Sequence, residues 1–180
     1  MTQLEMDRMY LELALEEAKQ AAKENTFPIG AVLVGPNHEL ISKGRNKVYS
    51  FHDATAHAEI DAIRESGNFL LLDENRYKCT IYTTVEPCPM CTGAILFANI
   101  TRVVWILNDP NFGGFRSFKE ANLFEKKLTK VSMLAQPFED LAIAQCELME
   151  NWEKNRNRNN VWEYSTENRS VTTDDSKCSK

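Results

Sequence analysis

Two short clusters, about thirty residues apart, carry residue types that could perform metal chemistry. The first is His57-Ala58-Glu59, and the second is Glu86-Pro87-Cys88-Pro89-Met90-Cys91. One imidazole and two thiolates are typical zinc ligands, and three protein ligands leave a tetrahedral zinc with an open position, as in catalytic sites. Zinc lowers the pKa of a bound water to about 7, which provides a hydroxide nucleophile near neutral pH. The clusters therefore predict a catalytic zinc held by His57, Cys88 and Cys91, with Glu59 free to move protons.

The spacing within each cluster restricts how helices can present these groups. Cys88 and Cys91 share a face if a helix begins there, and the helix dipole then favours their thiolates. His57 and Glu59 are two residues apart, so both reach one metal only if it lies off the start of their helix. We therefore predict that two helix N-termini point at one zinc. Taken alone, Cys-x-x-Cys could also be a redox pair or half of a structural zinc site, and His52 is a less favoured ligand.

Hydrophobic periodicity and turn residues predict the elements that position these clusters. The expected helices span 7–23, 56–65, 88–99, 118–127 and 137–154. The expected strands span 29–35, 40–44, 79–84, 102–107 and 129–134, and the first two form a hairpin. Irregular segments are expected over 46–55 and 108–116. Because strands alternate with helices, we predict an α/β fold, a three-layer α/β/α sandwich with a central five-stranded mixed sheet.

Length and composition suit a single folded domain over 1–154 of the 180 residues. The polar segment 155–180 is expected to be a partly disordered tail, in which Trp162 or Tyr164 is predicted to dock near the active site. The sequence contains no run of about 18 apolar residues, so no membrane span is predicted. Its first residues do not resemble a signal peptide, and a cytoplasmic location is therefore expected. The net charge of −5 argues weakly against extended nucleic-acid binding.

The two clusters and their surroundings resemble a known family. His57-Ala58-Glu59 followed by Pro87-Cys88-Pro89-Met90-Cys91 is similar to the signature of the cytidine deaminase superfamily of zinc-dependent deaminases. The other similar segments are Phe27-Pro28-Ile29-Gly30-Ala31-Val32, Asn46, Thr55-Ala56 and Tyr82-Thr83-Thr84-Val85-Glu86. The resemblance covers residues 6–152 and points to the branch of tRNA-specific adenosine deaminases, guanine deaminases and fungal-type cytosine deaminases.

The resemblance implies roles for individual residues. Glu59 would be the catalytic proton shuttle and not a zinc ligand. Asn46 would hold the base, and the backbone at Ala58 and Cys88 would contact substrate or the tetrahedral intermediate. Phe27 and Asp109 lie in similar segments and are further candidate substrate-binding residues. The implied cofactor is Zn²⁺, and the implied assembly is a homodimer.

The resemblance does not point to a single substrate, because different residues resemble enzymes that act on different bases. Pro89 resembles guanine deaminases, Asp109-Pro110 resembles the tRNA enzymes, and Thr83-Thr84 resembles the cytosine enzymes. The acidic net charge and Pro89 favour a free nucleobase or nucleoside, of guanine or cytosine type, as the small-molecule partner. The alternative is a tRNA-specific adenosine-to-inosine deaminase. A non-catalytic zinc-binding partner subunit is disfavoured because Glu59 is present.

Overall fold

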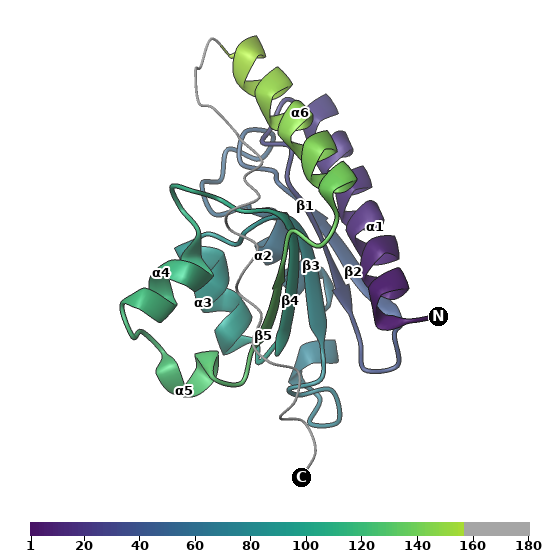
Figure 1. Ribbon diagram of the computed structural model, residues 1–180, viewed down its shortest axis with the longest axis vertical. Helices are drawn as coiled ribbons and strands as arrows, with labels where there is room; N and C mark the ends of the chain where they lie inside the picture. Colours follow the sequence, from purple (N-terminus) through teal and green to yellow (C-terminus); the bar gives the residue numbers. More distant parts are fainter. Residues whose placement is uncertain (157–180) are drawn as a thin grey trace.

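The computed structural model describes residues 1–156, which form a mixed β-sheet with helices on both faces (Figure 1). The strands are β1 (Gly30–Val34), β2 (Leu40–Arg45), β3 (Thr80–Val85), β4 (Arg102–Leu107) and β5 (Ser132–Ala135). Their order across the sheet is β2-β1-β3-β4-β5. β1 is antiparallel to both β2 and β3, whereas β3, β4 and β5 are parallel. The predicted five-stranded mixed sheet is confirmed.

The helices form a layer on each face of this sheet. They are α1 (Gln3–Lys23), α2 (Ala58–Glu65), α3 (Pro89–Phe97), α4 (Gly114–Glu120), α5 (Glu125–Leu128) and α6 (Glu139–Asn155), with a 3-10 helix, η1, at Phe69–Leu71. α1 and α6 lie side by side on one face, and α2, α3 and α4 are on the opposite side (Figure 1). The three-layer α/β/α prediction is therefore also confirmed.

Alternating side chains along each strand build a separate apolar core on each face, as the two-residue period of a strand requires. The core beneath α1 and α6 includes Val32, Val34, Tyr82, Val104 and Ile106. The core beneath α3 includes Leu33, Ile81, Val103 and Trp105. Because both of their faces are buried, the central strands β1, β3 and β4 consist almost entirely of apolar residues and Thr, which is typical of a sheet covered on both sides, whereas the edge strand β2 is more polar.

Several predicted boundaries are wrong. The single helix expected over 118–127 is two short helices, α4 and α5, because Phe124 between them has a left-handed backbone with φ 54°. α4 begins at Gly114, so the irregular segment expected over 108–116 ends earlier. The last strand begins at Ser132 and not at residue 129. α1 begins earlier than expected because Thr2 and Glu5 form a capping box.

The predicted tail lies almost wholly outside the described residues, and so do Trp162 and Tyr164. Its first residue, Asn155, is the last residue of α6. Among residues 1–156, no helix combines the length and apolar character that crossing a bilayer requires.

Candidate active site

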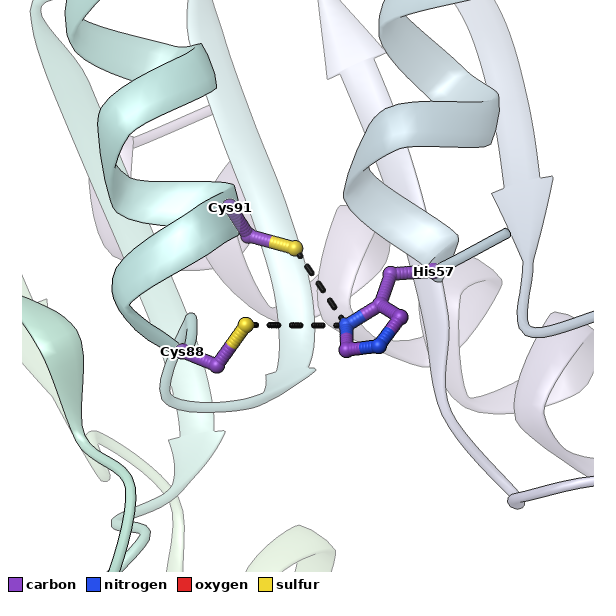
Figure 2. A group of neighbouring side chains, drawn as sticks. All are labelled: His57, Cys88 and Cys91. Carbon is purple, nitrogen blue, oxygen red and sulfur yellow. Dashed lines mark hydrogen bonds between the residues drawn. The ribbon is translucent and has the colours of Figure 1, made fainter. Parts of the chain in front are cut away.

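The three predicted metal ligands come together at the starts of two helices (Figure 2). His57 directly precedes α2 and Cys88 directly precedes α3, and both have the extended backbone of an N-cap residue. Cys91 lies in the first turn of α3 and is fully buried. The Nδ1 atom of His57 is 3.6 Å from the Cys88 sulfur and 3.5 Å from the Cys91 sulfur. The two helix N-termini thus converge on one group of side chains, as expected.

The spacing of these atoms fits a tetrahedral zinc ion. Bonds of about 2.3 Å to sulfur and about 2.05 Å to nitrogen, at the tetrahedral angle, hold the two atoms about 3.6 Å apart. The two measured distances, 3.6 and 3.5 Å, agree with that separation. All the ligand atoms lie within 4.8 Å of one another. One nitrogen and two sulfurs leave a fourth coordination position open.

The two cysteines differ electrostatically although they are three residues apart. A hydrogen bond from the Cys91 thiol, assisted by contact with His57, lowers the pKa of Cys88 to about 4. The same hydrogen bond, together with burial, raises the pKa of Cys91. The hydrogen bond with Cys88 raises the pKa of His57. A divalent cation bound among these atoms would favour the thiolate form of both cysteines, because its charge dominates the local electrostatics.

Glu59 lies in the first turn of α2, close to the metal ligands, and only 4% of it is exposed. The hydroxyl of Thr83, on β3, donates to its Oε1 at 3.4 Å. Burial raises the pKa of Glu59, and the nearby charge of Cys88 raises it further. A carboxyl group with a raised pKa in a cleft is suited to both accepting and donating a proton near neutral pH.

His57, Cys88 and Glu59 open onto a cavity of about 530 Å³, a volume in the usual range for small-molecule sites. Its lining residues come from distant parts of the chain: Phe27, Ile29, Asn46, His57, Glu59, Val85, Glu86, Cys88, Pro89, Met90, Asp109, Asn111, Phe112, Met149 and Glu153. Four of these residues carry a carboxyl group. Among the described residues that line the cavity, none is Lys or Arg.

Asn46 presents a fixed hydrogen-bond donor to this cavity. Its Oδ1 accepts from the Thr26 hydroxyl at 2.6 Å and from the Val48 backbone N–H at 3.1 Å. Because a backbone N–H can bond only to an acceptor, these contacts identify the amide oxygen. The amide NH₂ group is therefore the part of Asn46 that these two bonds leave available to a ligand. The sequence pattern predicted Asn46 but gave no sign of its bond with Thr26.

A buried ion pair fixes the loop after β4 to the cysteine motif. Glu86 is 2% exposed, and its carboxylate bonds the Arg116 guanidinium at 2.8 Å and the Asp109 backbone N–H at 3.3 Å. Gly114 packs so closely that a Cβ there would lie 2.7 Å from the carbonyl carbon and oxygen of Cys88. Asp109 in turn accepts from two backbone N–H groups of its own loop. The loop and the metal cluster therefore form one rigid unit.

An aromatic cluster joins α6 to the loops before β1 and after β2. The Phe27 and Trp152 rings lie 4.3 Å apart between centroids, and the Phe27 and Tyr49 rings lie 5.5 Å apart. The Arg156 guanidinium covers the Tyr49 ring at 3.8 Å and donates to the Asn25 carbonyl at 2.6 Å. Phe27, predicted from sequence, thus lines the cavity while anchoring the end of α6.

The remaining predicted contact residues occupy different settings. Asp109 lines the cavity, but its Oδ1 is bonded within the loop. Ala58 is fully buried at the first position of α2, directly after His57, and its backbone contact with substrate stays a prediction. Sequence reasoning missed Met149 and Glu153 on α6, both of which line the cavity. Their separation of four residues places them on one helix face, but the pattern does not indicate what that face covers.

Taken together, this α/β fold and a His-Cys-Cys group at two helix N-termini define a zinc-site enzyme domain. Residues 4–107 match the family described as the cytidine and deoxycytidylate deaminase zinc-binding region. The match covers more than half of the 180-residue chain, and the protein belongs to the cytidine deaminase superfamily. The family match and the side-chain cluster together identify Zn²⁺ as the cofactor.

Relatives in the superfamily act on different substrates. The chain is 35% identical over 133 residues to the tRNA-specific adenosine deaminase of Buchnera aphidicola, covering 74% of this chain and 81% of the relative. It is 39% identical over 99 residues to the cytosine deaminase of Candida albicans, covering 54% and 64%. A 45% match to the chloroplastic tRNA(adenine(34)) deaminase of Arabidopsis thaliana covers 56% of this chain and 8% of that protein. The chain thus spans less than two thirds of the length of the last two relatives.

Solved structures show the same division. A structure from a study of tRNA:A34 deaminases that perform A-to-I editing is similar with a TM-score of 0.64 at 31% identity, covering 78% of this chain and 99% of that chain. The guanine deaminase of Bacillus subtilis is similar with a TM-score of 0.53 at 28% identity, covering 92% and 100%. Membership of the superfamily is therefore established for this chain, and its relatives act on different bases.

Proposed function

We propose that this protein is a zinc-dependent hydrolytic deaminase that releases ammonia from a free nucleobase or nucleoside of guanine or cytosine type. The observation that carries the choice of substrate is the charge of the cavity wall. Four carboxyl groups and no Lys or Arg are found among its described lining residues. A phosphate bound inside the cavity would need cationic side chains beside it, so this wall favours an uncharged ligand that brings no phosphate into the cavity.

His57, Cys88 and Cys91 would hold the zinc, through Nδ1 and the two sulfurs. The bound ion would supply a water activated as the nucleophile near neutral pH. Glu59 takes a proton from that water and delivers it to the ring nitrogen beside the carbon under attack. It would then take the second proton, from the hydroxyl group now on that carbon, and give it to the departing amine, so that a C=O bond replaces the C–N bond and ammonia leaves. Its burial and raised pKa support both directions of transfer.

Asn46, Phe27, Ala58 and Asp109 would position the base. The Asn46 NH₂ group is oriented by the two bonds to its oxygen, which supports a role as donor to a ring nitrogen or carbonyl of the base. The Phe27 ring offers an apolar surface for the base plane. The backbone at Ala58 and Cys88 would contact the reacting atoms. Asp109 would fix the conformation of the loop after β4 where that loop lines the cavity.

A tRNA-specific adenosine deaminase is the second candidate. It is favoured by the relative from Buchnera aphidicola, of which the alignment covers 81%, and by the 31% identical structure from the tRNA:A34 deaminase study. A tRNA substrate would place only its target base in the cavity, and its phosphates would need cations elsewhere on the surface.

A panel assay separates these two functions. Ammonia release is measured for cytosine, guanine, adenine, their nucleosides and a tRNA transcript with adenosine at the wobble position, with the Glu59→Gln variant prepared identically as the control. We expect turnover of a base or nucleoside that the variant lacks. Inosine formation in the tRNA, without turnover of any small substrate, would instead establish the second candidate.

We also propose that residues 1–154 are the catalytic domain of a cytoplasmic homodimer, following the family resemblance. Light scattering after size exclusion should give a mass of twice the 20.6 kDa chain. A monomer that retains full activity would contradict the dimer.

A further inference from the structure

Of the four cavity carboxyl groups, three have roles in the site as described. Glu59 is the proposed proton shuttle, Glu86 pairs with Arg116, and Asp109 bonds the backbone of its own loop. The fourth is Glu153, near the end of α6. It lines the cavity although only 3% of it is exposed. A carboxyl group is rarely buried to this extent unless it has a structural or functional role.

The structure holds Glu153 at a defined place. Met149 and Glu153 are four residues apart, so both face the cavity from one side of α6. The neighbouring side of the helix carries Trp152, which packs on Phe27, and Arg156, which covers Tyr49. Those contacts fix the last turn of α6, which would otherwise fray. The carboxyl group of Glu153 therefore lies on a helical turn that the contacts of Trp152 and Arg156 hold in place.

Glu153 and Asn46 offer a ligand opposite hydrogen-bonding groups. The Asn46 NH₂ group donates, whereas an ionised carboxylate only accepts. A carboxylate has about four acceptor positions, so Glu153 can keep a contact within the protein and still bind a ligand. A ligand that satisfies both residues needs an acceptor for Asn46 and an N–H or O–H donor for Glu153. A free base offers a ring N–H, and a nucleoside offers ribose hydroxyls.

We propose that Glu153 is a specificity-determining residue, which accepts a hydrogen bond from a ring N–H or ribose O–H and rejects substrates that carry a 5′-phosphate. This inference rests on the proposed function and adds a residue and a rule of exclusion to it. No Lys or Arg is among the described residues that line the cavity, and a zinc ion held by two thiolates and an imidazole has no formal net charge, so a phosphate near Glu153 would meet a like charge. An uncharged base or nucleoside would meet an acceptor for its donor.

The experiment compares kcat/KM for cytosine, cytidine and cytidine 5′-monophosphate, and for the corresponding guanine and adenine series, in wild type and Glu153→Gln. Glutamine keeps the size of the side chain but removes the charge. For the accepted base or nucleoside we expect a fall of about ten- to a hundredfold, as for loss of a hydrogen bond to a charged group. Turnover of the monophosphate should hold or rise, so the nucleoside-to-nucleotide ratio should fall at least about tenfold.

Glu150→Gln is the matched control, because Glu150 lies on the same helix, pairs with the exposed Lys154 and is not among the described residues that line the cavity. It should leave the ratio unchanged. If Glu153→Gln does not fold, Glu153→Asp serves instead: it keeps the charge, so rejection of the phosphate should persist while turnover of the base or nucleoside falls.

Two results would overturn the inference while leaving the deaminase function standing. One is a nucleoside-to-nucleotide ratio that is the same in wild type and Glu153→Gln. The other is wild-type turnover of the monophosphate, or of tRNA, that equals or exceeds turnover of the base and nucleoside. Absence of ammonia release from every compound, tRNA included, would overturn the proposed function and the inference together.

Discussion

The two walls of the cavity are built in different ways. The reactive wall, formed by His57, Glu59, Cys88 and Cys91, comes from two short sequence segments that each begin a helix. The α6 wall, formed by Met149 and Glu153, faces a loop residue from near the other end of the chain, Phe27. The reactive wall therefore depends on local helix starts, whereas the α6 wall depends on packing between distant segments.

This difference separates reaction type from substrate choice. Every residue proposed to hold zinc or move protons lies within one turn of a helix N-terminus, so local backbone geometry places it. The other residues proposed to contact the substrate, such as Phe27, Asn46 and Glu153, come from loops before β1 and after β2 and from α6, which share no such local constraint. Relatives named as a tRNA-specific adenosine deaminase and as a cytosine deaminase belong with this chain to one superfamily, which is consistent with a constant reactive wall and a variable opposite wall.

Removal of zinc should have the largest effect, and it tests the reactive wall as a unit. Treatment with a strong chelator should abolish ammonia release, and added Zn²⁺ should restore it. Alkylation mapped by mass spectrometry should label Cys88, which is only partly buried and has a pKa lowered to about 4, only after chelation. Cys79 and Cys146 should stay slow to react in both forms, because they are buried and burial raises the pKa of each to about 11. Equal labelling of Cys88 before and after chelation would contradict its role as a ligand.

Glu59→Gln should leave zinc in place and remove most of the rate. General acid–base catalysis contributes about 10² to 10⁴ in rate, and glutamine cannot shuttle a proton. We expect kcat to fall by about that factor, with zinc content and thermal stability close to wild type, since Gln keeps the shape of a side chain that is not a ligand. Metal analysis alongside single-turnover kinetics measures both quantities. A variant that loses its zinc would show Glu59 to be structural.

Gly114→Ala should have an intermediate effect, through the contact between the loop and Cys88. A Cβ at Gly114 would lie 2.7 Å from two backbone atoms of Cys88, which cannot move without shifting a ligand. Overpacking of this kind costs about 1 to 3 kcal/mol in the free energy of unfolding. Gly93→Ala, in α3, is the matched control, because a Cβ there meets nothing within 4 Å, and removing a helical glycine should stabilise slightly. Thermal denaturation and zinc affinity of the pair would distinguish them; equal behaviour would disprove the tight contact.

The reactive wall could be predicted from the sequence, whereas most of the α6 wall could not. The metal group, the five strands and the mixed sheet followed from short motifs and periodicity, because helix caps and strand alternation are local rules. The break between α4 and α5 was missed because Phe124 adopts a left-handed backbone that its residue type does not suggest. Glu153 and the bond between Thr26 and Asn46 were missed because each depends on which distant segment packs opposite, and no local pattern encodes that choice.

Arg156→Ala should have the smallest effect and tests whether the α6 wall is held by packing at its end. The variant removes the guanidinium from the Tyr49 and Trp152 rings and from the Asn25 carbonyl. A cation over an aromatic ring at a partly exposed site contributes about 0.5 to 1 kcal/mol. We expect KM for the best small substrate to rise a few-fold with kcat nearly unchanged, because the last turn of α6 loosens while the reactive wall stays intact. Faster hydrogen exchange at the amides of residues 149–155 should accompany that change.

Lys154→Ala, at a side chain that is 70% exposed, is the control and should change neither quantity. If Arg156→Ala lowers kcat and leaves KM unchanged, the two walls are coupled and do not act separately.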